Sequence, residues 1–356
     1  MEGMIRNTKV KVDCFEIHVN INKSILKIES LKKVYYQCDP DHQEEGSDNL
    51  GSQILSRLID KNSSSFQNCV SIFKYLQNII SFESLCLHVD FEGMSGQFFK
   101  EILTEPALKD FEFLRLDKGE IDAECLDLAM ETAHSNRDLH IFSTKVPDDY
   151  YHENAFKFYD IFYGEAEWVR IEHLFTLKNQ NAVALARHNL TLSDLNTYIK
   201  VWIDNDHDMV GLVVISMSTF QPEIIFDGIN VLLGQRNGLT FYLVATNPTK
   251  QRKHQILGVT FYSNIISLFS WGKSQPIPFK GNVYDDSWEP EYKVLMILNK
   301  KKELEEELKN IQNLLKTNQD QNMFEKKNEI SRDLQNVSIE LDSYNLVFRD
   351  GVYSVM

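Results

Sequence analysis

A short strand-like run followed by an amphipathic segment recurs along this chain, and this recurrence constrains the fold more than any other feature. The strand-like runs begin at 85, 112, 138, 167, 182, 210 and 240, at intervals of 27, 26, 29, 15, 28 and 30 residues. Most of the intervals hold a segment with helical periodicity, as in the apolar face formed by Leu195, Tyr198, Ile199 and Trp202. Strand–helix units of roughly 20–29 residues are typical of leucine-rich repeats. The pattern therefore predicts an α/β fold, a leucine-rich-repeat-like strand–helix solenoid.

One competing architecture has the same alternation of strands and helices. A doubly wound α/β domain also places a helix after each strand, and the usual Asn/Cys position of leucine-rich repeats is missing here. The doubly wound sheet therefore stays open as an alternative fold.

The repeat does not extend to the end of the chain. We expect the solenoid-like region over 1–250, beginning with strands at 8–37 and a charged loop at 39–48, and an irregular linker or insertion over 251–291. Residues 292–344 predict a helical hairpin or short coiled coil, and 345–356 a closing strand. The two heptad seams of that hairpin consist of Ile297, Leu304, Leu308, Ile311 and Leu315, then of Ile330, Leu334, Val337 and Leu341.

Composition narrows the function classes. The net charge is −15, which disfavours binding to nucleic acid or to an anionic membrane surface. The longest apolar stretch, 257–271, is shorter than the roughly 20 residues of a membrane span. The chain has 5 cysteines without a CxxC pair, and it begins without a signal-peptide pattern. We therefore expect a cytoplasmic protein, with the nucleus as the alternative compartment.

The sequence shows no catalytic constellation. The phosphate-loop, dinucleotide and HExxH patterns are absent, and the ten histidines lack ligand spacing. Asp204, Asp206 and Asp208 resemble the start of a calcium loop, but Met209 replaces its glycine and Ile215 its bidentate glutamate. We therefore expect no enzyme, no catalytic residue, no cofactor and no metal site.

One block, 167–215, is more specific than the rest. It resembles the F-box-associated domain of the large nematode F-box family, which carries a Trp-Val opening, a Leu-Thr-x-x-Asp-Leu-Asn segment and a later Trp. The closing FRDGVYSVM also resembles the family's Arg-x-Asp-Gly strand. The matching residues are Trp168, Val169, Leu190, Asp194, Leu195, Asn196, Trp202, Asp350 and Gly351.

The resemblance implies a function in protein binding. Members of the family usually begin with an F-box, which binds the adaptor subunit of a cullin-type ubiquitin ligase, whereas residues 1–10 show no trace of one. The resemblance therefore implies a non-enzymatic recognition module like the substrate-binding part of an F-box protein. It implies contact with the ligase adaptor only if an F-box lies upstream. The protein target stays unidentified.

The matching residues also have a structural interpretation. Trp168 and Trp202 are expected to fill the core, Asp194 to act at a helix amino end, and Asn196 to bond to the backbone of a neighbouring turn. The alternative function is a structural scaffold protein that associates weakly with itself by dimerising through helices 292–344.

Overall fold

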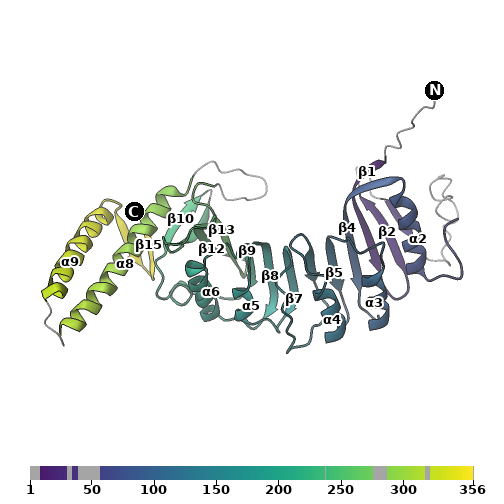
Figure 1. The fold of residues 1–356 in the computed structure, drawn as a ribbon, viewed down its shortest axis with the longest axis horizontal. Helices are drawn as coiled ribbons and strands as arrows, with labels where there is room; N and C mark the ends of the chain where they lie inside the picture. Colours follow the sequence, from purple (N-terminus) through teal and green to yellow (C-terminus); the bar gives the residue numbers. More distant parts are fainter. Residues whose placement is uncertain are drawn as a thin grey trace, which may run out of the picture. The chain divides into compact units, whose positions relative to one another are not determined.

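The computed structural model describes residues 9–29, 34–38, 57–236, 238–275, 287–316 and 321–355. The chain is a mixed α/β protein that forms two compact units (Figure 1). Unit 1 comprises Met1–Val169 with Val183–Asn189, and unit 2 comprises Arg170–Ala182 with Leu190–Met356. The α/β class is thus confirmed, whereas the division of the chain lies near 169–190 rather than at 250. The charged loop expected at 39–48 lies outside the described residues.

Unit 1 is built on parallel strands. β1, β4, β5, β6 and β7 pair in parallel in the spatial order β7-β6-β5-β4-β1, while β2 and β3 extend the β1 edge antiparallel. The strands are β1 (Val10–Val19), β2 (Ser24–Glu29), β3 (Val34–Gln37), β4 (Ile80–Asp90), β5 (Phe113–Asp117), β6 (Asp138–Ile141), β7 (Asp160–Ala166) and β8 (Gln180–His188). The helices are α2 (Ser65–Gln77), α3 (Gly96–Thr104) and α4 (Ala123–Met130).

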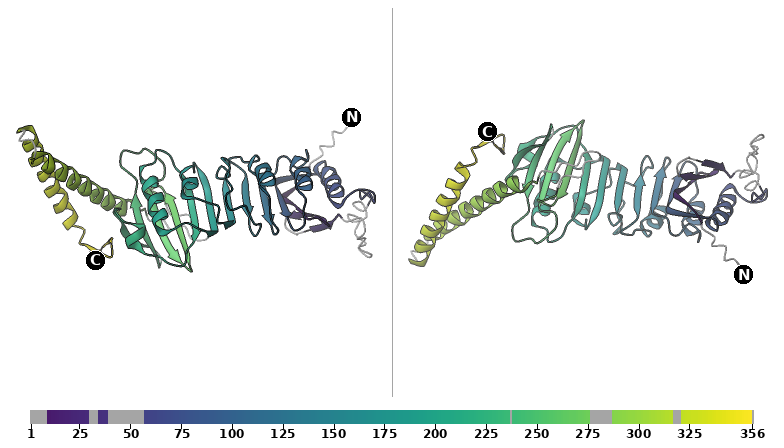
Figure 2. Two further views of the ribbon diagram at one scale, coloured as in Figure 1. Left: turned by 90° about the horizontal axis from the view of Figure 1, so that it is seen from below. Right: turned by 90° about the horizontal axis from the view of Figure 1, so that it is seen from above.

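The strands of unit 1 bury one face only. Side chains alternate between buried and half-buried along β4, β5 and β6, as the pleat requires. A ladder of register partners, with spacings of 27, 25 and 22 residues, supplies the buried face with Leu87, Leu114, Leu139 and Ile161. The helices contribute their apolar faces to this core, for example Phe99 and Ile102 from α3. Figure 2 gives two further views of the strands and helices.

Unit 2 contains an antiparallel sheet and the C-terminal helices. Its strands follow the order β14-β15-β10-β11-β12-β13-β9, and only β10 and β15 pair in parallel. The strands are β9 (Val210–Ser216), β10 (Leu232–Arg236), β11 (Leu239–Ala245), β12 (Ile256–Tyr262), β13 (Ile265–Trp271), β14 (Leu346–Arg349) and β15 (Val352–Val355). The helices are α5 (Ile171–Phe175), α6 (Leu192–Asp204), α7 (Pro222–Ile225), α8 (Glu289–Leu315) and α9 (Gln321–Asp342).

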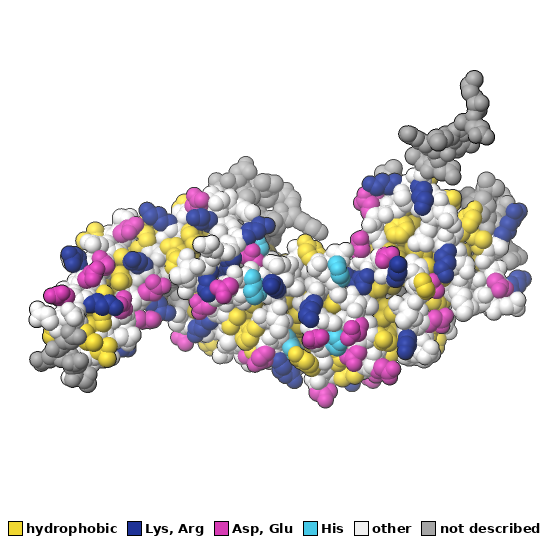
Figure 3. Space-filling view, in the orientation of Figure 1, with side chains coloured by type: hydrophobic (Ala, Val, Ile, Leu, Met, Phe, Trp, Pro, Cys, Tyr) yellow, Lys and Arg dark blue, Asp and Glu magenta, His cyan; other side chains and the backbone are white. Residues whose placement is uncertain are grey.

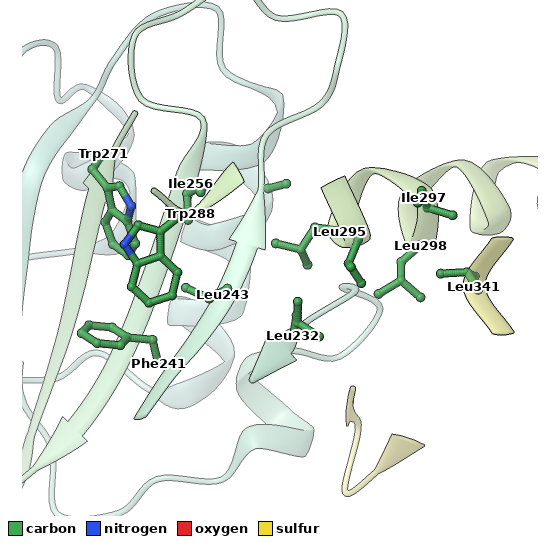
Figure 4. Packing of buried hydrophobic residues seen from close by; sticks show 12 residues of the cluster. Leu232, Phe241, Leu243, Ile256, Trp271, Trp288, Leu295, Ile297, Leu298 and Leu341 are labelled. Atoms are coloured by element: carbon green, nitrogen blue, oxygen red, sulfur yellow. The ribbon is translucent and has the colours of Figure 1, made fainter. Parts of the chain in front are cut away.

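A tryptophan pair anchors the first turns of α8 to this sheet. The indoles of Trp271 and Trp288 lie with centroids 5.7 Å apart, and Phe241 packs edge-on against both (Figure 4). Gly258 makes this packing possible, because a Cβ there would lie 2.3 Å from the Trp271 ring. Leu295 follows from α8 into the same cluster.

Helices α8 and α9 form the expected C-terminal helical pair. The predicted seams face each other inside the pair, where Leu304 and Ile311 from α8 pack with Ile330 from α9. None of the described helices is long and apolar enough to cross a membrane.

Three expectations about secondary structure were wrong. The irregular segment 251–291 contains a hairpin, β12–β13, whose turn residues Ser263 and Asn264 both have positive φ, and a Ser-Asn pair is a weaker turn signal than Asn-Gly. The closing strand at 345–356 is also a hairpin, β14–β15. The strand expected at 167–171 lies earlier, at 160–166. Trp168 and Val169 follow that strand, and their apolar side chains pack in the core instead of belonging to a paired strand.

Candidate functional site

Trp168 and Val169, near the start of the block 167–215, serve the core of unit 1. The Trp168 indole is 2% exposed and packs against Tyr150 and Tyr163, at centroid distances of 5.4 and 5.1 Å. Its Nε1 donates to the carbonyl of Glu165 at 3.1 Å. Since the ring and its only donor are both satisfied internally, Trp168 is a fold determinant.

The residues of α6 are structural as well. Asp194 and Thr191 form a reciprocal capping box, with the Asp194 carboxylate accepting from the Thr191 amide at 2.7 Å. Asn196 donates to the carbonyls of Ile225 and Asp227 at 2.9 and 3.0 Å. Both expected roles are confirmed. The apolar members of the set, Leu190, Leu195 and Trp202, are buried.

Asp350 and Gly351 make a turn. Arg349 pairs with Val352 across it, and the two turn residues have φ values of 52° and 81°. This is the left-handed pair that tightens a two-residue hairpin, for which Asp-Gly is well suited. The residues that carry the family resemblance therefore form no shared site, and the functional surface has to be sought elsewhere.

The half-buried face of unit 1 is the best candidate. We define the open face as the outward side chains of β1, β4, β5, β6 and β7, opposite the leucine ladder. Its middle row consists of register partners on successive strands: His18, His88, Arg115, His140 and Phe162. Phe113 lies beside this row, with its ring 5.7 Å from His88 and 4.7 Å from His140. Parallel pairing thus aligns histidine, arginine and phenylalanine side chains across five strands.

A groove of about 960 Å³ lies over this face. It is lined by equal numbers of basic and acidic side chains, namely Lys23, Lys27, Arg115 and Lys118, and Glu16, Glu29, Asp90 and Asp117. Close pairs join Lys27 to Glu16 at 2.6 Å and Lys118 to Asp90 at 2.6 Å. On the view in Figure 3, basic and acidic side chains of the described residues are likewise interspersed. The groove therefore suits a ligand that carries both signs of charge.

A compact polar network occupies the β1 end of the groove. The Lys27 ammonium lies between Glu16 and Glu29, at 2.6 and 2.7 Å, and the second oxygen of Glu16 lies 3.0 Å from His18 Nε2. Burial opposes the Glu16 charge, but the hydrogen bonds from Lys27 and His18 outweigh it and lower the pKa of Glu16. Burial lowers the pKa of His88 to about 4, with the charge of His18 adding to the effect. His88 is therefore neutral at pH 7.

Two thiols lie on the same face. Cys14 and Cys86 have their sulfur atoms 3.2 Å apart across β1 and β4. The hydrogen bond from Cys86 lowers the pKa of the Cys14 thiol, while the same contact raises the pKa of Cys86. The pair places a reactive sulfur next to the polar network.

Unit 2 holds a set of residues that resembles a catalytic triad in type but not in geometry. Both Ser270 Oγ, at 3.0 Å, and Asp208, at 3.8 Å, approach the same nitrogen of His254, Nδ1. A relay needs the acid and the nucleophile on opposite ring nitrogens. Ser270 is also buried and donates to the Val210 carbonyl. The arrangement therefore attaches the loop that precedes β12, which carries His254, to strand β13, which carries Ser270.

The calcium-like aspartates are also occupied. Asp206 pairs with Lys250 at 2.6 Å, and Asp208 accepts from the amides of Lys253 and His254 at 3.3 and 2.8 Å. Asp204 accepts from Asn247 at 3.4 Å. These three side chains connect the end of α6 to the loop before β12.

Sequence reasoning missed the open face as a site. Glu16 and His18 are two residues apart on a strand, which places both on one face. His88 comes from a strand 70 residues away in sequence, and only the parallel register of β1 with β4 sets it beside His18. A Glu-x-His on a strand is the one local signal, and it is weak by itself.

Comparison with known proteins adds no assignment. No protein-family model, no curated protein and no solved structure matches this chain.

Proposed function

We propose that this chain is a protein-recognition module that binds its target on the open face of unit 1. The observation that carries the proposal is the row of His18, His88, Arg115, His140 and Phe162, aligned in register. The first three of these residues line a groove of about 960 Å³. Arginine and aromatic side chains, here Arg115 and Phe162, are enriched in protein interfaces. The mixed charge of the groove matches a polypeptide better than a nucleic acid.

We infer a leucine-rich-repeat-like solenoid for unit 1. Strands β4 to β7 pair in chain order, helices α3 and α4 connect successive strands, and the buried ladder repeats every 22–27 residues. A doubly wound sheet reverses its strand order and binds ligands at the reversal, whereas β4 to β7 continue in one direction and the order changes only beside β1. Solenoids use the extended surface formed by successive repeats for binding.

The resemblance of 167–215 to F-box-associated domains supports a more specific role. We propose that the module acts as the substrate-binding part of an adaptor for a cullin-type ubiquitin ligase, in which other subunits carry out ubiquitin transfer. The contact with the ligase adaptor would belong to an F-box, whereas the contact with the target would belong to the open face.

The test is affinity purification of the protein tagged at its own locus, followed by quantitative mass spectrometry. Arg115→Glu reverses a charge on the open face, and Lys109→Glu makes the same change at an exposed residue outside the groove. A target should be recovered with the wild type and with Lys109→Glu and be depleted at least about tenfold with Arg115→Glu, equivalent to about 1.4 kcal/mol. An unchanged set of proteins in all three purifications would reject the open face as the binding surface.

The same purification tests the ligase role separately. Recovery of a cullin adaptor subunit with all three proteins would support it, since that contact does not involve Arg115. Recovery of a target without the adaptor subunit would leave a recognition module and remove the ligase role.

A further inference from the structure

Three potential metal ligands converge at the β1 end of the groove. Glu16, His18 and His88 each offer one ligand atom, and these atoms lie within 4.8 Å of one another. Two of them are fixed by the pleat of β1, and the third by the register of β4, in which His88 is the direct partner of His18. The convergence thus follows from regular pairing rather than from a loop conformation.

The donor set indicates the class of ion. Two imidazole nitrogens and one carboxylate oxygen form the protein ligand set of one class of zinc site, in which water or substrate takes the fourth position. Calcium and magnesium prefer oxygen ligands throughout, so the two imidazoles disfavour them. We propose that Glu16, His18 and His88 bind one divalent transition-metal ion, best matched by Zn²⁺, with a coordination position open to the groove.

The surroundings of the site support this assignment. Lys27 donates to one oxygen of Glu16 and leaves the other, 3.0 Å from His18 Nε2, available as a ligand. Such a hydrogen bond to a ligating carboxylate orients it toward the metal. The positive charges that face the site are balanced, because Lys27 also pairs with Glu29, and Arg115 pairs with Asp117.

Only a small movement is needed to close the site. Bond lengths of about 2.0–2.2 Å place tetrahedral ligand atoms about 3.4 Å apart, so the widest observed separation must contract by about 1.4 Å. The side chain of His18 is 39% exposed, so part of its ring faces solvent rather than the packed core. The fourth position would be taken by water or by a donor atom of a molecule in the groove.

The test is metal binding by the purified full-length protein, kept reduced and first stripped with a chelator. Calorimetry with Zn²⁺ should show one equivalent bound by the wild type. His88→Ala and Glu16→Gln should each weaken the affinity by at least the roughly 10–100-fold that loss of an outer-shell partner causes. Since a substitution at half-buried His88 could also disturb the fold, His18→Ala at the exposed ligand gives an independent measurement with the same expected loss. The matched control is His140→Ala, in the same row but outside the cluster, which should bind like the wild type.

The thiols of Cys14 and Cys86 are the competing location for the metal ion. Cys14→Ser/Cys86→Ser should retain the Zn²⁺ equivalent, and the Co²⁺-loaded wild type should lack a thiolate-to-metal charge-transfer band. Loss of binding in the double serine variant, or such a band in the wild type, would assign the metal to the sulfurs and overturn the proposal. The proposal would equally be overturned if the wild type bound no Zn²⁺, or if His18→Ala and His88→Ala bound it normally. Target binding on the open face is measured separately, so either proposal can fail alone.

Discussion

Trp202 shows how a single residue couples α6 to the rest of unit 2. Its indole is 1% exposed, and the guanidinium of Arg252 stacks on it at 4.0 Å. Burial lowers the pKa of Arg252 to about 10, yet the group remains charged at neutral pH. Arg252 Nη1 donates to the His207 carbonyl at 3.3 Å, whereas among the described residues its Nε and Nη2 atoms have no hydrogen-bond partner. The ring face and the charge of Asp208 therefore add to the compensation of the buried charge.

Trp202→Ala should therefore be strongly destabilising. Truncation of a core aromatic costs about 3–5 kcal/mol, and here it also removes the ring beneath Arg252. The measurement is urea denaturation followed by circular dichroism. Tyr262→Ala, at a side chain that is 81% exposed in the same unit, is the control and should change stability by less than about 0.5 kcal/mol. Equal midpoints for the wild type and Trp202→Ala would contradict the core role.

Asp138 is a residue at which ionisation opposes folding. Burial raises its pKa from 3.8 to about 6, and the charge of Asp160 adds to this, against a hydrogen bond from the Asp160 amide. Between these two pH values the folded state holds more protons than the unfolded state, so the contribution to stability falls as the pH rises toward 6. The carboxyl is therefore a cost at pH 7.

Asp138→Asn should remove that cost. The side chain is half exposed, and after solvent screening we expect the variant to be about 1 kcal/mol more stable than the wild type near neutral pH, with the difference vanishing below about pH 4. Urea denaturation across this pH range measures it. Asp148→Asn makes the same change of side chain at an exposed aspartate and is the matched control. A stabilisation by Asp138→Asn that persists in acid would refute the assignment to ionisation.

At the scale of elements, the sequence predicts the strands and helices that have a clear hydrophobic periodicity of their own. The strands of β4, β5, β6, β8 and β9 and the helix α6 all lie where periodicity places them, because a leucine alternation or a capped amphipathic face needs no distant partner. Helix α7 ends after Ile225 although the apolar periodicity continues beyond it, since Gly228 has a φ of 72° and residues 232–236 pair as β10. Tertiary pairing there overrides local propensity.

The candidate site was not predictable for a related reason. The carboxylate nearest to His88 in sequence, Asp90, is not part of the cluster, and the relation of His88 to Glu16 and His18 depends on which strand pairs with β1. The neighbour of β1 on this side is β4, separated from it by β2, β3 and α2. A shift of one residue in that register would place His88 on the buried face.

The C-terminal helical pair allows a matched comparison within α9. Ile330 is 5% exposed and packs with Leu304 and Ile311, whereas Ile339 is 61% exposed. Ile330→Ala should weaken the pair by about 2 kcal/mol, which corresponds to roughly 30-fold faster amide exchange in α8 and α9. Ile339→Ala removes the same atoms from the surface and should leave the exchange unchanged. Hydrogen–deuterium exchange with mass spectrometry distinguishes the two, and equal effects would mean that the pair is not held by this cluster.

At the scale of the whole molecule, the chain path links the two compact units more than once. Residues 170–182 belong to unit 2, 183–189 to unit 1 and 190–356 to unit 2, so the chain passes between the units three times. The block that resembles F-box-associated domains, 167–215, covers all three passages. Trp168, Asp194 and Asn196 lie in this block, and their structural roles agree with its position at the three passages of the chain.

The packing of the C-terminal helices also determines whether the chain associates with itself. The heptad seams of 292–344 suggest a dimer, but their apolar residues already pack between α8 and α9 of one chain. With the seam used internally and a net charge of −15 that adds long-range repulsion, we expect a monomer. Sedimentation velocity over a hundredfold range of concentration should give a constant coefficient. A sedimentation coefficient that rises with concentration would favour the scaffold function. If Ile339→Glu abolished that rise, the contact between chains would lie on the exposed side of α9. Tyr262→Glu, at another exposed residue, is the control and should have no effect.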